Sequence, residues 1–426
     1  MRDLLAARSQ MAMSLAFHIV FAAIGIGMPV LMAIAEWRWL RRKDEAALAL
    51  AHRWARGTAI LFAVGAVSGT VLSFELGLLW PGFMALAGPI FGMPFSLEGF
   101  AFFLEAIFLG IYLYGWDRVS PWTHWLAGVM VAVSGTLSGI FVVIANAWMN
   151  TPAGFDLVAG RAVNVDPIAA MRNPAALSET VHMTLAAFAA VGFAVAAIHA
   201  HLLRKDPRNL FHRRAVAIAL GVGGAAALLQ PLSGDMSARQ VARAQPAKLA
   251  AMESHLQTGR AAPLRVGPLR IPYGLSLLAF HDPHALVKGL EEFPPADRPP
   301  VAVVHLAFQV MVACGLAMAA TALLGGWLYV RRRALPDAPW YLRLVTLCGP
   351  LGFVAIEAGW TVTEVGRQPW IIHGVMRTSE AVTPMPHLVV PFATFTVLYF
   401  FLALVVGVLL RRQVFESPRL VAPDEA

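Results

Sequence analysis

The sequence predicts an all-α integral membrane protein of about nine transmembrane helices. Of its 426 residues, 58% are hydrophobic and only 14% are charged, whereas about a quarter of the residues of a soluble domain carry charge. The hydrophobic residues also form long runs, such as 11–34 and 388–410, which match the ~30 Å hydrocarbon core of a bilayer. Because every backbone polar group in lipid must be paired within its own segment, these runs are expected to be helices.

Nine apolar runs, each bounded by charged residues or by Pro and Gly clusters, give the expected spans. In chain order they are 11–35, 57–80, 96–115, 123–148, 180–203, 214–232, 302–330, 341–363 and 387–410. The first run is too long for the hydrophobic part of a signal peptide and lacks a small-residue cleavage site, so it is expected to remain as the first span. The chain 1–426 is therefore expected to form a single membrane domain.

The positions of Lys and Arg orient these spans. One set of alternate connections carries 19 of them and the other set 14, but eight of the 14 lie in the long segment 233–301. The positive-inside rule discounts long segments, so the comparison is 19 against 6. It predicts an outer N-terminus, a cytoplasmic C-terminus and an outer location for 233–301. These clusters also explain the net charge of +8, which therefore does not indicate nucleic-acid binding.

Segment 233–301, between the sixth and seventh spans, is the one sizeable extramembrane element expected. Its stretch Pro246–Leu256 is expected to be helical, and the proline-rich stretch 292–300 is typical of turns. A connection of this length in a compact protein is usually functional or disordered. The two cysteines, Cys314 and Cys348, both lie inside apolar runs, so the sequence indicates neither a disulfide framework nor a cysteine metal site.

Carboxylates inside the spans are candidates for function because they are costly in lipid. Glu98 and Glu105 are seven residues apart in the third span, so they share one helix face about 10 Å apart. Glu357 and Glu364 repeat this spacing in the eighth span. Such pairs are typical of proton relays or of cofactor ligands, and hydrogen bonding between packed helices is the alternative.

Histidine and methionine side chains inside the spans are candidate haem ligands. His18 lies in the first span, His182 near the outer end of the fifth, and His305 near the outer end of the seventh. For each histidine a packing role is the alternative. Most of the 17 methionines are expected to fill the core, and Met311 becomes a candidate only in context, since Met and His together ligate low-spin haem. His18, His182, Met311, Glu98 and Glu364 all fall in the outer half of the membrane, so we expect cofactors gathered beneath segment 233–301.

The run Gly359–Trp370, with sequence GWTVTEVGRQPW, closely resembles the GWxxxExGRQPW signature of subunit I in cytochrome bd-type oxidases. Six other stretches resemble the same family in the same order along the chain. They are Gln10–His18, Ile90–Pro94, Gly115–Arg118, Ala145–Met149, Lys248–Glu253 and Met311–Gly315. The resemblance covers nearly the whole chain except its C-terminal tail.

The resemblance implies three haems and a set of ligands. It makes His182 and Met311 the axial ligands of a low-spin haem b, with Trp360 of the signature among the cofactor-binding residues. It makes His18 and Glu364 the ligands of two high-spin haems, and leaves open which haem takes which ligand.

The resemblance also implies catalytic and substrate-binding residues. It places Glu98 and Glu105 beside the high-spin haems, with Ser138 alongside in a proton route. Lys248 and Glu253 of segment 233–301 are expected to contact quinol. Arg367 is expected to neutralise haem propionates or the ligand Glu364, a role that its bidentate guanidinium suits.

Two features depart from the more familiar family pattern. Gln309, two residues before Met311, stands where many members carry Arg, and segment 233–301 is short. Both resemble the short-loop, cyanide-insensitive branch, in which haem b can replace haem d, so the oxygen site is expected to hold either one. Losing that positive charge is also expected to lower the potential of the low-spin haem.

The expected function is a quinol:oxygen oxidoreductase in a bacterial cytoplasmic (inner) membrane. Quinol would be oxidised on the outer side, oxygen reduced to water, and protons taken from the cytoplasm. The family implies a second subunit as partner, with small single-helix subunits and membrane lipid as further partners. A transporter would explain the buried carboxylates but not the signature. A dihaem anchor would need paired histidine ligands at depth, and a haem–copper oxidase would need a histidine cluster.

Overall fold

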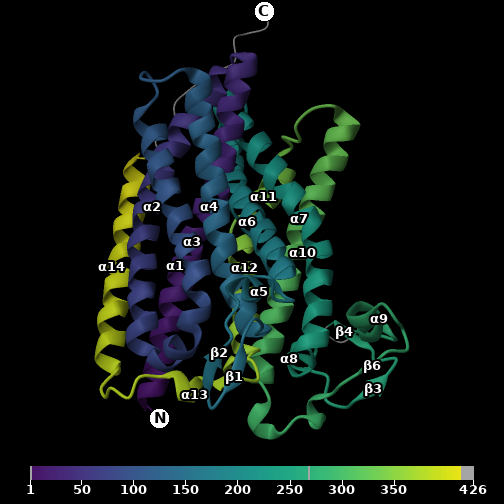
Figure 1. The fold of residues 1–426 in the computed structure, drawn as a ribbon. Coiled ribbons are helices and arrows are strands. Elements are labelled where there is room, and N and C mark those ends of the chain that lie inside the picture. The colour runs from purple at the N-terminus through teal and green to yellow at the C-terminus, as the bar shows by residue number, and fades with distance from the viewer. Residues whose placement is uncertain (1, 267–268, 414–426) are drawn as a thin grey trace, which may run out of the picture.

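The computed structural model describes residues 2–266 and 269–413 and shows a bundle of long helices (Figure 1). Within those residues, nine segments are long and apolar enough to cross a membrane, as the sequence predicts. They are α1 (Arg2–Arg42), α2 (Glu45–Leu79), α3 (Pro81–Tyr114), α4 (Pro121–Asn150), α6 (Ala176–Lys205), α7 (Leu210–Ala244), α10 (Val301–Arg332), α11 (Pro339–Cys348) with α12 (Leu351–Val365), and α14 (Val389–Gln413).

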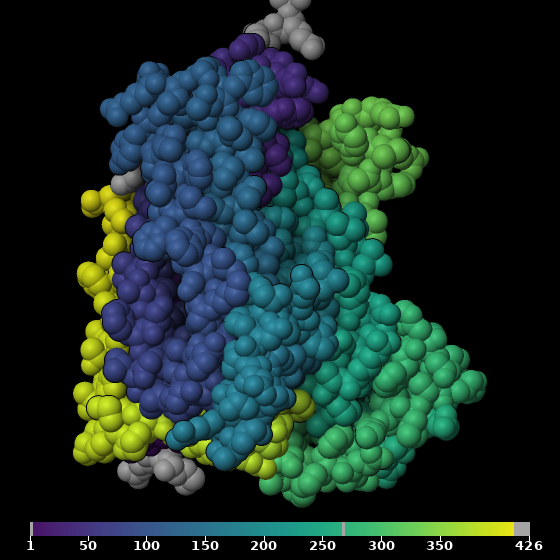
Figure 2. Space-filling model, viewed as in Figure 1, coloured from purple at the N-terminus to yellow at the C-terminus, as the bar shows by residue number. Residues whose placement is uncertain are grey.

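The helices pack as two neighbouring groups. In the first group α1 contacts α2 and α4, and α3 packs along α4; in the second, α6 packs along α7 while α10, α11 and α12 close the group. Contacts of α6 with α1 and α4 join the two groups. Helix α14 lies outside both, along α1 and α2, and forms the yellow ridge on one side of the molecule in Figure 2. Its exposed Val397 and Phe400 are suited to lipid.

Close approaches between helices depend on glycine. A Cβ added at Gly192 of α6 would lie 2.4 Å from the Cα of Gly223 in α7, so these two backbones touch. A Cβ at Gly352 of α12 would lie 2.3 Å from the Cα of Ala190 in α6. Small residues at such contacts are typical of membrane helices, whose association depends on close packing because lipid is as apolar as leucine.

The short elements gather at one end of the bundle, together with the start of α1 (Figure 1). They comprise the short helices α5 (Pro167–Met171), α8 (Pro246–Met252), α9 (Gly274–Phe280) and α13 (Thr378–Ala381), the 3-10 helices η1 (Leu290–Glu292) and η2 (Pro295–Asp297), and eight strands. We call this the loop end. The basic residues between α1 and α2 lie at the opposite end, which we call the basic end.

The strands add small sheets to the predicted all-helical fold. In the part of the chain that the structure describes, they form four two-stranded antiparallel pairs. β1 (Asp156–Val158) pairs with β2 (Arg161–Val163), β3 (Gly259–Arg260) with β6 (Leu286–Val287), β4 (Leu264–Val266) with β5 (Leu269–Ile271), and β7 (Trp370–Ile372) with β8 (Met376–Arg377). All four lie outside the candidate spans, so the membrane-spanning part is helical, as expected.

Several helix ends differ from those predicted. α7 continues twelve residues past the expected end at Leu232, so the first part of segment 233–301 is helix and not loop. The predicted third span began at residue 96, after these prolines, but α3 starts at Pro81 and includes Pro89 and Pro94. The eighth span is interrupted at Gly349 and Pro350, where α11 ends and α12 begins. Apolar runs mark the lipid-facing length of a helix, whereas these helices extend beyond it.

Candidate functional site

Glu98 and Glu105 both face α4 from α3, and Ser138 of α4 contacts Glu98. Ser138 Oγ donates a hydrogen bond to Glu98 Oε1 at 3.2 Å. Glu105 is 6% exposed, and its Oε1 would lie 3.0 Å from a Cβ at Gly135 of α4 and 3.5 Å from one at Gly25 of α1. The Glu105 carboxyl therefore occupies a space between three helices that two glycines leave open.

His18 projects from α1 toward α2. Its Nδ1 lies 3.0 Å from Ser68 Oγ, and a Cβ added at Gly69 would lie 3.0 Å from its Cε1. A histidine that binds a metal usually has its second ring nitrogen held by a hydrogen bond. The contact with Ser68 holds Nδ1 in this way, so Nε2 is the atom suited to binding.

His182 lies between α6 and α7 and, like His18, has a serine beside its Nδ1, but its Nε2 also has a polar neighbour. Its Nδ1 lies 2.9 Å from Ser233 Oγ, and the Gln230 amide nitrogen lies 3.2 Å from its Nε2. A Cβ at Gly234 would come within 3.6 Å of the ring. Both predicted histidine ligands thus pair with a serine and face a glycine on the next helix.

Met311 of α10 faces α12. A Cβ added at Gly359 would lie 2.9 Å from the Met311 sulfur, so only glycine leaves room for it. Trp360, the next residue of α12, is half-buried. The glycine and the tryptophan that begin the family-like signature therefore lie beside the predicted methionine ligand.

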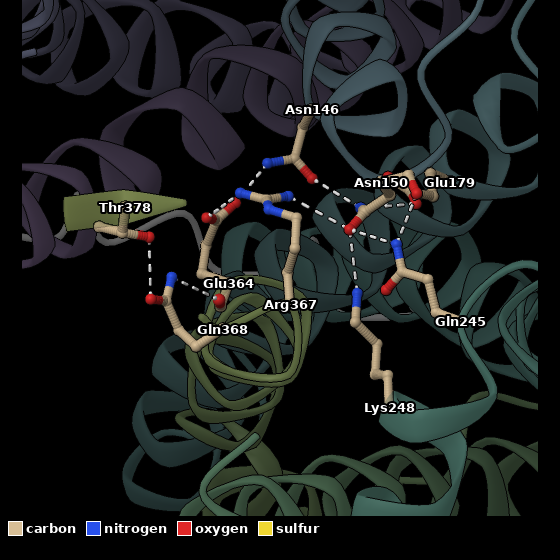
Figure 3. Close-up of polar contacts among 9 residues, drawn as sticks. All are labelled: Asn146, Asn150, Glu179, Gln245, Lys248, Glu364, Arg367, Gln368 and Thr378. Atoms are coloured by element: carbon tan, nitrogen blue, oxygen red, sulfur yellow. Dashed lines mark hydrogen bonds and ion pairs between the residues drawn. The ribbon is translucent and has the colours of Figure 1, made fainter. Parts of the chain in front are cut away.

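Glu364 and Arg367 anchor a buried polar network at the loop end of α12 (Figure 3). Glu364 accepts hydrogen bonds from Asn146 of α4 and from the Arg367 guanidinium. Arg367, 2% exposed, also donates to Asn150 Oδ1 at 3.2 Å. Lys248 Nζ of α8 donates to the same Asn150 oxygen at 2.9 Å. Asn150 thus joins a cation from segment 233–301 to the cation beside Glu364.

Several members of this network (Figure 3) were not predicted as site residues from the sequence. Asn146 and Asn150 close the end of α4, and the Asn150 amide donates to Glu179 Oε1 of α6 at 3.0 Å. Gln245 donates to the Asn150 carbonyl at 2.7 Å. These residues lie at helix ends, where polar side chains are ordinary. Their one signal is that Asn146 belongs to the family-like stretch Ala145–Met149.

Lys248 and Glu253, expected at the quinol site, both lie in or directly after α8 and are buried, at 3% and 6% exposure. Burial, together with the nearby Arg367, lowers the pKa of Lys248. Burial raises the pKa of Glu253 to about 7, and its Oε2 has no hydrogen-bond partner within the described residues. A carboxyl with these properties can exchange a proton near neutral pH.

A pocket of about 300 Å³ lies beside α8, where Pro246 and Ala247 meet Phe293, Pro294, Trp370 and His373. His373 is held by a hydrogen bond from its backbone nitrogen to the Met149 carbonyl. Burial and the nearby Lys248 and Arg367 lower the pKa of His373. The pocket is therefore a partly apolar, aromatic space placed against the network of Figure 3.

A family model, curated relatives and a solved structure were compared with the chain, and all of them point to the same family. The family model "Cytochrome bd terminal oxidase subunit I" matches residues 6–418. The chain is similar to "Putative cytochrome bd menaquinol oxidase subunit I" of Bacillus subtilis (strain 168), with 36% identity over 96% of each chain. It is also similar to "Cytochrome bd ubiquinol oxidase subunit 1" of the same organism, with 34% identity over 90% of this chain and 87% of the relative.

A solved structure shares the whole fold. It is described as "The structure of bd oxidase from Geobacillus thermodenitrificans" and aligns with a TM-score of 0.92 and 39% identity, covering 98% of this chain and 99% of the other. The match extends over both helix groups and segment 233–301. The chain therefore belongs to the cytochrome bd terminal oxidase subunit I family and is the multi-pass subunit I of a terminal quinol oxidase of the respiratory chain.

Proposed function

We propose that this subunit oxidises quinol at the outer face of the membrane and uses the electrons to reduce oxygen to water with protons from the cytoplasm. Two quinols and one oxygen molecule would give two quinones and two waters. The observation that carries the proposal is the hydrogen-bonded path from Lys248 through Asn150 and Arg367 to Glu364. It supports a direct structural link between segment 233–301 and the expected haem region.

The quinol site would be the pocket beside α8. Its aromatic and proline walls suit a quinone ring. Glu253 directly follows α8 without lining the pocket, and burial raises its pKa to about 7, which suits the role of base. Lys248 is buried behind this surface and hydrogen-bonded to Asn150, which favours an electrostatic role on the inner wall over direct contact. Segment 233–301 would then serve as the outer quinol-binding loop.

Membership of the family implies haems, and the side chains support three of them. His182 and Met311 would hold a low-spin haem b, with Trp360 against it. His18 and Glu364 would hold two high-spin haems, haem b with haem d or with haem b in its place. Gly69, Gly234 and Gly359 support this fit, because each leaves bare helix surface beside a predicted ligand. Bound haem would supply the electron-transfer and oxygen chemistry.

The branch and the partners follow from the same proposal. Gln309 and the short segment 233–301 favour the short-loop, cyanide-insensitive branch. Subunit I works with a subunit II, and the exposed apolar sides of the bundle, such as Phe100 and Phe103 of α3, are suited to that partner, to small single-helix subunits or to lipid. The complex would lie in the bacterial inner membrane.

Protons would reach the oxygen site along α3. Glu105 lies two helical turns nearer the basic end than Glu98, on the same face, so it would pass protons toward Glu98 and Ser138. Glu105→Gln keeps the size and hydrogen bonding of the side chain but cannot release a proton. We expect it to slow oxygen reduction at least about tenfold with normal haem content, and Glu105→Asp to retain part of the activity.

The matched control is Ser134→Ala. Ser134 is buried on the same helix as Ser138, but it donates only to carbonyls of its own helix among the described residues, so its removal should leave turnover unchanged. Near wild-type turnover of Glu105→Gln would make Glu105 a packing group. Loss of a high-spin haem from Glu105→Gln would make it a ligand or a support of the haem pocket.

A further inference from the structure

The polar face of α3 continues beyond Glu105 to Tyr112. Glu98, Glu105 and Tyr112 are spaced by seven residues, so they lie along one face with about 10 Å between successive members. Helix α4 faces them with glycine: a Cβ at Gly135 would lie 3.0 Å from Glu105 Oε1, and a Cβ at Gly128 would lie 2.6 Å from the Tyr112 ring. The Tyr112 ring is fully buried. The row of polar side chains on this face of α3, which begins at Glu98, therefore extends about two helical turns beyond Glu105 toward the basic end.

Close to Tyr112 lies another buried carboxyl group, that of Glu36. Glu36 of α1 and His124 of α4 are 0% and 1% exposed, and His124 Nδ1 lies 2.8 Å from Glu36 Oε1. The other ring nitrogen of His124 lies 2.9 Å from the Tyr112 carbonyl oxygen. The rings of Tyr112 and His124 are 4.5 Å apart, and the Tyr112 hydroxyl is close enough to Glu36 to interact with it.

Two polar atoms of this cluster are left over. Glu36 Oε2 and Tyr112 Oη are buried and make no hydrogen bond of good geometry within the described part of the chain. A buried polar group without a hydrogen-bond partner is destabilising, so internal water commonly satisfies such atoms. A clamp between α1 and α4 would need the Glu36–His124 contact alone. It would not need a second buried carboxylate oxygen and a buried phenol hydroxyl beside it, both without a hydrogen-bond partner in the described residues.

The cluster also has a connection to the aqueous side. The His124 ring contacts the Trp116 ring at a tilt, with centroids 3.9 Å apart, and Trp116 stacks on His52 at 3.7 Å. His52 is partly exposed and lies within the field of Arg56 first, and then of His124, Glu36 and Asp117. Glu36 lies six residues before the end of α1, about 9 Å below the basic cluster that begins the connection to α2. Lys and Arg concentrate on the cytoplasmic side.

We propose that Glu36 and His124, with Tyr112 as the link, form the cytoplasmic intake of the proton path to Glu105. The inference rests on the proposed function, since it assumes that Glu105 relays protons. A proton from the cytoplasmic water binds the Glu36–His124 pair and passes to the Tyr112 hydroxyl, which releases its own proton toward Glu105. Each group regains its starting state, so no net charge stays in the membrane. The ~10 Å between Tyr112 and Glu105 requires intervening water.

The test compares three variants of the complete oxidase: Glu36→Gln, Glu36→Asp and Tyr112→Phe. Haem content and the reduction of haem by quinol should be normal in all three. In a single turnover of the fully reduced enzyme with oxygen, Glu36→Gln and Tyr112→Phe should slow proton uptake at least about tenfold. Both should enlarge the rate difference between H₂O and D₂O. Glu36→Asp should recover part of the rate, because it restores a carboxyl.

The matched control is His199→Gln. His199 is also buried near the basic end and its Nδ1 lies 2.9 Å from His212 Nδ1, but the pair lies between α6 and α7, away from α3. It should change neither proton uptake nor the isotope effect. If Glu36→Gln fails to assemble, Tyr112→Phe decides alone, because it removes one oxygen atom and keeps the ring packed against Gly128.

The outcomes separate this inference from the proposed function. Wild-type proton uptake in Glu36→Gln and Tyr112→Phe, with slow uptake in Glu105→Gln, would overturn the intake and leave the Glu105 relay standing. Wild-type uptake in all three would overturn both. Slow uptake in Glu36→Asp equal to that in Glu36→Gln would make the pair a structural contact, since a carboxyl alone would then not restore transfer.

Discussion

Arg367 shows how single residues organise the loop end. Its guanidinium contacts a carboxylate oxygen of Glu364 and the side-chain oxygen of Asn150 in different directions. A planar, forked cation can satisfy both partners at once, whereas the point charge of lysine cannot. A buried cation that loses its partner costs several kcal/mol, so the geometry of Glu364 and Asn150 is tied to that of Arg367.

The haem ligands give the most direct residue-level prediction. His182→Ala and Met311→Leu should each remove the six-coordinate, low-spin spectrum, because each deletes one proposed axial ligand. The high-spin signals should persist, since His18 and Glu364 come from other helices. A reduced-minus-oxidised spectrum of the purified complex measures both. An unchanged low-spin band in both variants would refute the assignment.

Glu253 gives a prediction for pH. Burial raises its pKa to about 7, so the carboxyl is protonated below that pH and cannot accept the proton that quinol must release. Quinol oxidation should therefore fall as the pH drops below about 7 and rise above it. Glu253→Gln should be slow and should lose this dependence.

Oxygen consumption with an artificial one-electron donor is the control for Glu253, because that donor bypasses the quinol pocket. It should stay near the wild-type rate in Glu253→Gln and in Lys248→Ala. Equal loss with both donors would show that these residues support the structure and do not serve the substrate.

At this scale the sequence singled out part of the candidate site, and the roles of those residues stay predictions. Hydropathy made Glu98 and Glu105 stand out because charge is rare inside spans, and the Glu98–Ser138 contact followed from family resemblance. Glu179 and Asn150 could not be found in this way, since polar residues at helix ends are common. Their partnership joins positions 29 residues apart, and Lys248 reaches Asn150 from 98 residues away. Only the packed helices bring such positions together.

At the scale of helices, glycine contacts set how closely neighbours approach. The backbones of α6 and α7 meet at Gly192 and Gly223. Gly192→Ala should destabilise the protein by about 1–3 kcal/mol, because the methyl group must push apart two helix backbones that cannot yield as a side chain would. The thermal unfolding temperature of the detergent-solubilised complex should fall measurably.

Gly221→Ala is the matched control for Gly192→Ala. Gly221 lies on α7 only two residues from Gly223, but a Cβ there meets no atom within 4 Å. Its substitution should leave stability unchanged or raise it slightly, because alanine favours helix. If both variants melted alike, the close contact at Gly192 would carry no special cost.

The sequence predicted the existence and order of the nine candidate spans found in residues 2–266 and 269–413, but not their ends. The extension of α7 past Leu232 carries Asp235 and Arg239, which form an ion pair with each other one turn apart. The apolar run ends near Leu232, whereas the helix continues to Ala244. The break at Gly349 and Pro350 was missed because both flanking pieces are apolar, and a hydropathy scan reads them as one run.

At the scale of the whole molecule, an odd number of spans separates the two ends. The start of α1 and segment 233–301 lie at the loop end, and α14 ends at the other (Figure 1). Positive charge puts the loop end outside the cell. His281→Cys at the loop end should therefore react with a membrane-impermeant thiol reagent in intact spheroplasts, whereas Ala334→Cys at the basic end should react only after permeabilisation.

The native cysteines do not obstruct this labelling experiment. Cys348 is buried and Cys314 lies within α10, so a chain with its natural cysteines serves as the blank. Labelling of Ala334→Cys from outside, with protection of His281→Cys, would invert the orientation and with it the cytoplasmic source of protons.

The network of Figure 3 limits how such a sequence can change during evolution. Glu179, Lys248, Glu364 and Arg367 come from three separate parts of the chain, yet each lies within the field of the others at the loop end. Two carboxylates and two cations balance there, so a substitution that removes one charge leaves another uncompensated in a poorly hydrated space. Lineages should therefore exchange these positions in oppositely charged pairs, and the loop and the end of α12 should diverge together although 116 residues separate Lys248 from Glu364.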